Sequence, residues 1–439
     1  MSFSQALSGL NAQSENLKIL SNNIANSQTV GFKSSGALFA DVFAGANSQV
    51  GLGVSVADVR QDFTAGDLEN TGRTLDLAVA GEGFYRVEQV NGEAAFTRNG
   101  EFTQDSEGFL VNAANQRLTG YGLADPNEPF SEVVPGGAPQ ALRIPQDDIP
   151  ANATTEVNAT FNLNASTPTG ANTTQAATVL DENGVEQTVN YHFSNSYTIY
   201  DSLGNERNVT SYFTKNATVS NKWDVEVALD GVIGGFDGNI GSGGNHFTTE
   251  FDTNGGLSGI DATTGATSVA LSFNDSEPTN PAVGTPYELD GAENLAITLE
   301  LRGTTQYNND SVQNTLSQDG YTSGSLAGLE ITNDGRVIRL FTNEERRDAG
   351  QIVLANFANV EGLQPIGDNA WRETNASGVS VIGTAGTGVY GTIESGVLEN
   401  SNVELASQLV DTIVAQRAYQ ANSTTISTQD EILQTIINL

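Results

Sequence analysis

Hydrophobic residues recur at helical spacing at the two ends of the chain. In residues 3–24 they follow alternating steps of four and three, with Ser14 and Ser21 filling two positions of a seam made by Phe3, Leu7, Leu10, Leu17 and Ile24. In residues 401–439, which contain no Gly or Pro, a second stripe repeats every seven residues as Tyr419, Ile426 and Leu433, and Ile437 extends it. Val403, Ala406, Val410 and Ile413 open a neighbouring stripe. These patterns predict a long helix at each end of the chain.

The start of the second helix carries a local signal. Ser401 and Glu404 have the spacing of a capping box, in which each side chain satisfies a free backbone N–H of the first turn. A helix from there to Leu439 would be about 55 Å long, which is more than most globular domains contain. Such a length favours a coiled coil or docking in an assembly, although both helices could also pack inside one domain.

The middle of the chain alternates with a period of two. Tyr85–Val90 leads into Asn91-Gly92, a strong hairpin signal because both residues tolerate positive φ. Further strands are predicted at 196–200, 208–213, 223–229 and 336–341, separated by turns rich in Gly, Asn and Asp. The pattern therefore predicts a multidomain α+β protein: long terminal helices forming a coiled coil, and discontinuous antiparallel β domains of sandwich or barrel type.

Charge divides the chain in the same way. The whole chain has 18 Lys and Arg against 53 Asp and Glu, a net charge of −35. Residues 1–45 are neutral, with two basic and two acidic residues, whereas residues 146–317 hold four basic and 22 acidic residues, a net charge of −18. Nucleic acid is disfavoured as a partner because phosphate binding needs clustered Lys and Arg. We expect neutral ends to be buried and an anionic middle to face solvent, either for solubility alone or to set repulsion between copies.

Candidate catalytic chemistry is sparse. The chain has no Cys and only two His, His192 and His246, so thiolate sites are excluded and a two-His metal or catalytic site has little support. The glycine run 383–388 has no Lys and fails as a phosphate loop, and Asp252 opens a calcium-like loop that lacks the twelfth-position Glu. We expect no enzyme, cofactor or metal. A secreted β-rich adhesin or glycan-active enzyme remains an alternative, with its cleft in residues 146–317.

The sequence also shows no pattern typical of a membrane-spanning helix or a secretory signal. No run of apolar residues reaches 18, which predicts no membrane-spanning helix. The first basic residue is Lys18 and no apolar core precedes it, so we expect no cleaved secretory signal.

Motifs at both ends carry a family resemblance. Ser8–Ala12, Leu20–Asn26 and Thr29–Lys33 resemble the N-terminal signature of bacterial flagellar rod and hook proteins, and Gln416–Asn422 with Thr428–Leu433 resembles their C-terminal signature. Almost the entire chain is similar to the hook members of this family, most weakly over about 146–317. The signature positions are Asn22, Asn23, Ile24, Ala25, Asn26, Gly31, Phe32, Lys33, Gln416, Arg417, Tyr419 and Asn422.

The resemblance implies a structural subunit and an organisation in four parts. Residues 1–27 with 401–439 would form a helical coiled-coil domain lining an inner tube, and 28–70 with 364–400 a connecting region. Residues 71–145 with 318–363 would form a discontinuous β domain, and 146–317 an inserted outer β domain. The heptad residues at both ends would be the assembly interface. A distal rod subunit is the alternative within the family.

The same resemblance implies partners and a location. Copies of the chain would form a hollow curved tube that acts as a universal joint carrying torque from rod to filament. Further partners would be the hook cap, the distal rod, the hook–filament junction proteins and the flagellar export apparatus. The location would be the flagellar hook and basal body, outside the cell after export without a cleaved signal.

Overall fold

The computed structural model describes residues 3–42, 51–169, 174–181, 185–233, 245–261, 263–273, 289 and 291–437. The chain divides into two compact units. The first unit comprises Met1–Asp147, Ala327–Leu340 and Arg346–Leu439, and the second comprises Asp148–Leu326 and Phe341–Glu345. The finer four-part division of the sequence stays a prediction.

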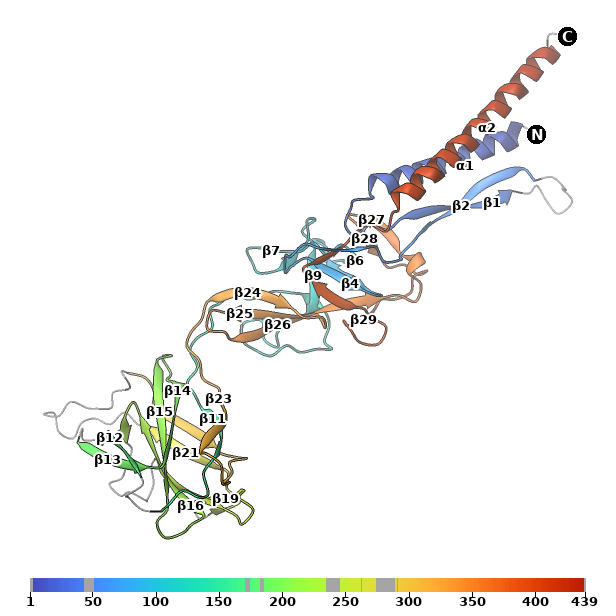
Figure 1. Cartoon of the computed structure of the whole chain (residues 1–439). Helices are drawn as coiled ribbons and strands as arrows, with labels where there is room; N and C mark the ends of the chain where they lie inside the picture. Colours follow the sequence, from blue (N-terminus) through green and yellow to red (C-terminus); the bar gives the residue numbers. More distant parts are fainter. Residues whose placement is uncertain are drawn as a thin grey trace. The chain divides into compact units, whose positions relative to one another are not determined.

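The first unit contains both terminal helices. Helix α1 spans Phe3–Ala25 and helix α2 spans Leu405–Ile437, and they lie side by side in opposite directions (Figure 1). The predicted capping box at Ser401 is wrong, because α2 begins four residues later. The reason is that Asn402 accepts a hydrogen bond from the Ser34 N–H and donates to the Asp62 carbonyl, which holds residues 401–404 outside the helix.

Segments from the two ends of the sequence pair with each other in the first unit. Strands β1 (Ser35–Val42) and β2 (Gly53–Gln61) form an antiparallel hairpin. Strand β3 (Leu68–Asn70) pairs with β31 (Val397–Glu399), and β4 (Leu77–Ala80) pairs with β30 (Thr392–Ser395). Each of the latter pairs ties an early segment to a late one, so neither end of the chain can fold this region by itself.

The main sheet of the first unit is open. Its path runs β24-β25-β26-β9-β5-β6-β28-β27, and short strands β7, β8, β10 and β29 pair beside it. The predicted hairpin at Asn91-Gly92 is confirmed as the connection of β5 to β6, with Gly92 at φ 83°. The bounds are β5 Phe84–Glu88, β6 Ala94–Thr97, β7 Thr103–Gln104, β8 Leu110–Val111, β9 Arg117–Tyr121, β10 Gln140–Ala141, β24 Leu326–Ile331, β25 Arg336–Phe341, β26 Arg346–Asn356, β27 Gln364–Gly367, β28 Ala370–Arg372 and β29 Val381–Thr384. A 3₁₀ turn, η2, covers Val360–Gly362.

Two sheets share one core in the second unit. One runs β21-β22-β11-β23 and the other β13-β12-β17-β16-β18-β19-β20, with β15 and β14 continuing from β16. Side chains of both sheets meet in one buried cluster, for example Phe161 of β11 and Trp223 of β16. The bounds are β11 Glu156–Asn162, β12 Gln175–Asp181, β13 Glu186–Tyr191, β14 Phe193–Tyr200, β15 Glu206–Lys215, β16 Lys222–Leu229, β17 Val232–Ile233, β18 His246–Phe251, β19 Leu257–Ile260, β20 Thr263–Thr264, β21 Ser268–Phe273, β22 Leu295–Glu300 and β23 Val312–Gln318.

The sheets therefore correct one alternative of the predicted fold class. Within the described residues the protein has a helix near each end and β-sheets between them, which confirms this part of the predicted α+β class. The main sheet paths of these residues have free ends, so the closed barrel is wrong. Alternation of apolar and polar residues fixes which face of a strand is buried, but it does not fix whether the last strand pairs with the first.

Candidate assembly interface

The two terminal helices contact each other in a defined register. A side chain at Gly9 would meet the Asn422 amide at 2.9 Å, and Asn23 Nδ2 donates to Gln408 Oε1 at 3.0 Å. The residue numbers 9 and 422 add to the same total as 23 and 408. This is expected for antiparallel helices, because both rise by the same distance per residue. Position 3 of α1 is therefore level with about position 428 of α2.

Most of the buried side chains in this helix pair are small or polar. On α1 the buried residues are Ala6, Gly9, Ala12, Leu20 and Asn23, and on α2 Ala415 is buried. Small residues let two helix backbones approach closely, as Gly9 does against Asn422. The contact between α1 and α2 thus uses few of the large apolar residues of either helix.

The predicted seam residues are placed differently along the pair. Phe3 and Leu7 are exposed, and Leu10, Leu17 and Ile24 are half-buried. On α2, Tyr419 and Ile426 are half-buried and Leu433 is exposed, whereas the side chain of Ile437 lies outside the described residues. As an interface between copies of the chain, these residues stay a prediction.

The first turns of α2 have an exposed apolar surface that is not part of the heptad stripe from Tyr419 to Ile437. Leu405, Leu409, Val410, Ile413 and Val414 are all exposed. The second apolar stripe of the sequence contains Val410 and Ile413, so the sequence pattern indicates part of this surface. Leu405, Leu409 and Val414 can be added from the helical period once the start of α2 is known.

Hairpin β1–β2 packs on another part of α1. Gln5 Nε2 donates to the Gly51 carbonyl at 2.6 Å, and the Val54 N–H donates to Ser8 Oγ at 3.2 Å. Leu38, Phe39 and Val59 of the hairpin remain exposed. Helix α1 therefore has partners on two sides, whereas the described contacts of α2 are mainly with α1.

The N-terminal signature residues hold the end of α1 and the turn after it. Asn23 is buried, donates to the Ser35 carbonyl at 2.8 Å and accepts from the Ser35 N–H at 3.0 Å. Asn26 Nδ2 bonds back to the Asn22 carbonyl at 3.0 Å. Ile24, Asn26 and Phe32 are half-buried, and Asn22 and Ala25 are exposed at the end of the helix.

Gly31 occupies a backbone position that excludes other residues. Its φ is +68°, in the left-handed region, and a Cβ there would lie 2.6 Å from the Asn99 backbone nitrogen. Its own N–H donates to the Glu399 carbonyl at 2.8 Å. Gly31 thus brings the N-terminal signature directly onto strand β31 near the C-terminal end.

Lys33 belongs to a buried charge cluster that we call the junction cluster, formed by Lys33, Arg98 and Glu399. Lys33 Nζ lies 2.6 Å from Glu399 Oε1, and Arg98 Nη1 lies 3.4 Å from Glu399 Oε2. Lys33 also donates to the Thr64 carbonyl at 2.6 Å. Burial lowers the pKa of Lys33 and of Arg98, and the Glu399 carboxylate opposes both shifts. The signature indicated Lys33, but nothing in the sequence indicated Arg98 or Glu399, because their proximity depends on β31.

The C-terminal signature is split between contact and solvent. Asn422 lies against Gly9, and Tyr419 is half-buried on the same helix. Gln416 and Arg417 are exposed. The structure therefore gives Asn422 a role in helix pairing and leaves Gln416 and Arg417 available to other molecules.

An aromatic cluster lies beside the junction cluster. Phe63 packs edge-on against Phe84 and Trp371, at ring-centroid distances of 5.6 and 5.4 Å. Trp371 Nε1 donates to Gln61 Oε1 at 2.6 Å, which fixes the base of hairpin β1–β2 on the main sheet. Edge-to-face pairs of this kind add about 0.5–1.5 kcal/mol each beyond area burial.

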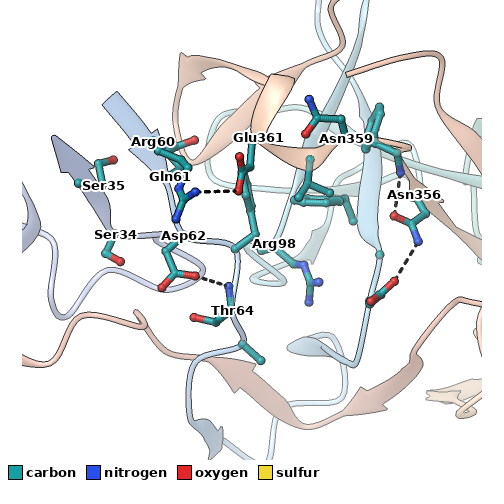
Figure 2. A pocket seen from close by; sticks show the side chains of 18 of the residues that line it. Ser34, Ser35, Arg60, Gln61, Asp62, Thr64, Arg98, Asn356, Asn359 and Glu361 are labelled. Atoms are coloured by element: carbon teal, nitrogen blue, oxygen red, sulfur yellow. Dashed lines mark hydrogen bonds and ion pairs between the residues drawn. The ribbon is translucent and has the colours of Figure 1, made fainter. Parts of the chain in front are cut away.

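An open cleft of about 1010 Å³ borders these clusters (Figure 2). Arg60 of β2 and Glu361 of η2 approach within 3.7 Å across it, and the Thr64 N–H donates to Asp62 on the hairpin side. Figure 2 shows Arg98 among the residues that line it. Among the described side chains no group of three His, Cys, Asp or Glu could hold a metal ion.

The remaining sequence candidates serve local structure in the second unit. Asp252 accepts from the Asn254 and Gly256 N–H groups and so closes a turn. His192 Nδ1 accepts from the Lys215 N–H, and His246 Nδ1 lies 3.9 Å from Glu226. Within the part of the chain that is described, no helix is long and apolar enough to cross a membrane.

Family models match both ends and the middle of the chain. Residues 4–33 match the flagella basal body rod protein family, and 394–439 match the flagellar basal body rod FlgEFG protein C-terminal family. Residues 78–161 match the flagellar hook protein FlgE/F/G D1 domain, and 185–321 match the flagellar basal body protein FlaE D2 domain.

Relatives and a solved structure agree with these matches. The flagellar hook protein FlgE of Escherichia coli is 42% identical and that of Salmonella typhimurium 40%, each over 100% of both chains. The one of Borreliella burgdorferi is 32% identical over 99% of this chain and 98% of its own. The crystal structure of the Helicobacter pylori flagellar hook protein FlgE2 covers 76% of this chain and 100% of its own, with a TM-score of 0.51 at 14% identity, which shows a shared fold. The chain therefore belongs to the flagellar hook protein family and is a structural subunit of the bacterial flagellum.

Proposed function

We propose that copies of this chain polymerise through their terminal helices into a hollow curved tube that joins rod to filament and transmits torque around a bend. The observation that carries the proposal is the state of the helix pair. α1 and α2 bury small residues against each other, and Phe3, Leu7, Leu409, Val410 and Leu433 are left exposed. A chain that leaves large apolar side chains in water on two paired helices gains free energy when neighbours cover them.

The heptad spacing supports a coiled-coil arrangement of these helices within the tube, with Leu10, Leu17, Ile24, Tyr419, Ile426 and Ile437 completing the interface alongside the exposed residues. The neutral charge of residues 1–45 keeps like-charge repulsion low where copies pack closely. The net charge of −18 in residues 146–317 would instead make the second units of neighbouring copies repel each other. Salt screens this repulsion within about 8 Å at physiological ionic strength.

Partners and delivery follow from the same proposal. The subunit passes through the flagellar export apparatus without a cleaved signal and meets the distal rod, the hook cap and the hook–filament junction proteins. The absence of Cys is consistent with passage as an unfolded chain, because no disulfide has to be broken or made.

Electron microscopy of the purified full-length chain under polymerising conditions tests the proposal. We expect curved tubes from the unchanged protein. Ile426→Asp places a charge on the half-buried face of α2 and should abolish the tubes, whereas Ser427→Asp, one residue away and exposed, should leave them. Failure of the unchanged chain to form tubes would overturn the proposal, and normal tubes from Ile426→Asp would overturn the assignment of Ile426 to the interface.

A further inference from the structure

The exposed apolar residues of the helix pair fall into two separate groups. The proximal patch is Leu405, Leu409, Val410, Ile413 and Val414, at the start of α2. The distal patch combines Phe3 and Leu7 of α1 with Ile432 and Leu433 of α2. The antiparallel register places all four distal residues at the same end of the pair, because position 3 is level with about 428 and position 7 with about 424.

A polar stretch separates the two patches on α2. The exposed side chains there include Gln416, Gln420, Ser423, Thr424 and Ser427, and the described residues from 415 to 431 include no exposed large apolar side chain. Val410 is 59% exposed and Leu433 49%, so the described residues cover neither patch. The two bare surfaces are thus discrete, apolar and different from each other.

We propose that the distal patch of one copy packs on the proximal patch of the next copy, so that the α2 helices of successive copies run in the same direction with an offset of about 23 residues. At about 1.5 Å per residue this offset is about 34 Å along the helix. The inference rests on the proposed polymeric function and adds its contact and spacing. Two different, complementary patches on one chain make a heterologous contact, which extends into an open polymer and does not stop at a dimer.

The sequence of α2 fits this offset on both apolar and charged positions. An offset of 23 places Ile432 level with Leu409, and Leu433 level with Val410. No acidic residue becomes level with another: Asp430 becomes level with Ser407, Glu431 with Gln408, and Asp411 with Gln434. Asp411 of one copy is then about one helical turn away from Glu431 of the other. The register therefore covers the apolar groups of both patches and sets no two carboxylates of α2 at the same level, where like charges would oppose contact.

Cysteine cross-linking tests the offset directly, because the chain has no Cys of its own. The double variant Val410→Cys with Leu433→Cys is assembled in full length and oxidised. Its two thiols are about 34 Å apart within one helix, and a disulfide needs Cα atoms within about 7 Å, so any bond must join two copies. We expect a ladder of dimers, trimers and longer chains on a denaturing gel. The matched control, Gln420→Cys with Leu433→Cys, should give no ladder.

A second pair of variants keeps the test decisive if a cysteine variant assembles poorly. Val410→Lys and Leu433→Asp should each reduce the sedimentable polymer at least tenfold. The double variant should recover most of it, because the introduced ammonium and carboxylate would then meet across the contact. Recovery supports the proposal. A double variant no better than the worse single variant overturns it, as does a ladder from the Gln420→Cys control in place of the Val410→Cys pair. If the unchanged chain fails to polymerise, the proposed function itself fails.

Discussion

The helix pair and the junction cluster differ in which side chains they bury. At the junction, Lys33, Arg98 and Glu399 are buried and paired, and Phe63, Phe84 and Trp371 pack on one another. In the helix pair, most of the buried residues are small or polar, with Leu20 as the exception, and large apolar residues such as Leu409 and Leu433 face water. The junction residues are therefore buried within one chain, whereas the helix pair leaves large apolar side chains exposed. The difference shows that a chain can pack one region with its own residues and leave another with apolar surface, which the proposed polymer would cover.

Removing the charge of Glu399 should have the largest effect. Glu399→Gln leaves two buried cations without a counter-charge, and breaking a buried pair in this way costs about 3–5 kcal/mol. Trp371 reports on the first unit and Trp223 on the second, so unfolding followed by Trp371 fluorescence in a Trp223→Phe background measures the loss. The exposed Glu404→Gln is the control and should change stability by under about 0.5 kcal/mol. An unchanged Trp371 transition would mean that the junction does not depend on the cluster.

Gly31→Ala should rank second. The left-handed φ costs roughly 1–2 kcal/mol for a residue with a Cβ, and the 2.6 Å approach to the Asn99 backbone adds overpacking, for a total of about 2–4 kcal/mol. Denaturant unfolding read by Trp371 measures the change. Gly36→Ala provides the control, since nothing lies within 4 Å of its Cβ position. Equal stability of the two variants would contradict this role of Gly31.

Asn23→Ala should loosen the helix pair where it meets the hairpin. The substitution leaves the Ser35 backbone groups and Gln408 without their partner, at roughly 1–3 kcal/mol. Amide hydrogen exchange along α1 is the measurement, and exchange near Ser35 should speed up most. Asn22→Ala, on the exposed side, should leave exchange at Ser35 unchanged. Equal acceleration throughout the first unit would show that the helix pair and junction unfold together.

Acid should lower the stability of the second unit through Asp201. This unit contains neither the helix pair nor the junction and therefore serves as a reference. Burial raises the pKa of Asp201, but hydrogen bonds from Asn205 and Arg207 outweigh it and hold the pKa below its usual value. The folded carboxyl is thus the stronger acid, and its stabilisation is present above about pH 4 and is lost as pH falls from there through the lowered pKa. Trp223 fluorescence in a Trp371→Phe background should show a pH-dependent stability loss that Asp201→Asn flattens. An identical pH profile in Asp201→Asn would remove Asp201 as the cause.

The smallest effect on the folded monomer is expected at the proximal patch. Leu409 is exposed, so Leu409→Ser should change unfolding stability by under about 0.5 kcal/mol. Circular dichroism melting measures this change, and sedimentation of the polymer should fall at the same time. A monomer destabilised as much as by Asn23→Ala would mean that Leu409 is already packed within the chain.

The sequence was a good guide to elements and a partial guide to the site. Periodicity located both terminal helices, and Asn91-Gly92 located a hairpin, because these signals act over a few neighbouring residues. The start of α2 was misplaced because Asn402 bonds to Ser34 and Asp62, which are distant in sequence. Arg98 and Glu399 had no signal for the same reason.

The sequence by itself determined the helical ends, the β-rich middle, the uneven charge and, through its motifs, the family. Only the tertiary structure decided which face of each helix is covered, because a heptad marks an apolar stripe without saying whether the same chain or another copy packs on it. The helices meet through small and polar residues such as Gly9 and Asn422, and Leu409, Val410 and Leu433 stay exposed. Burial depends on the competition among all surfaces of the fold, which no local pattern contains.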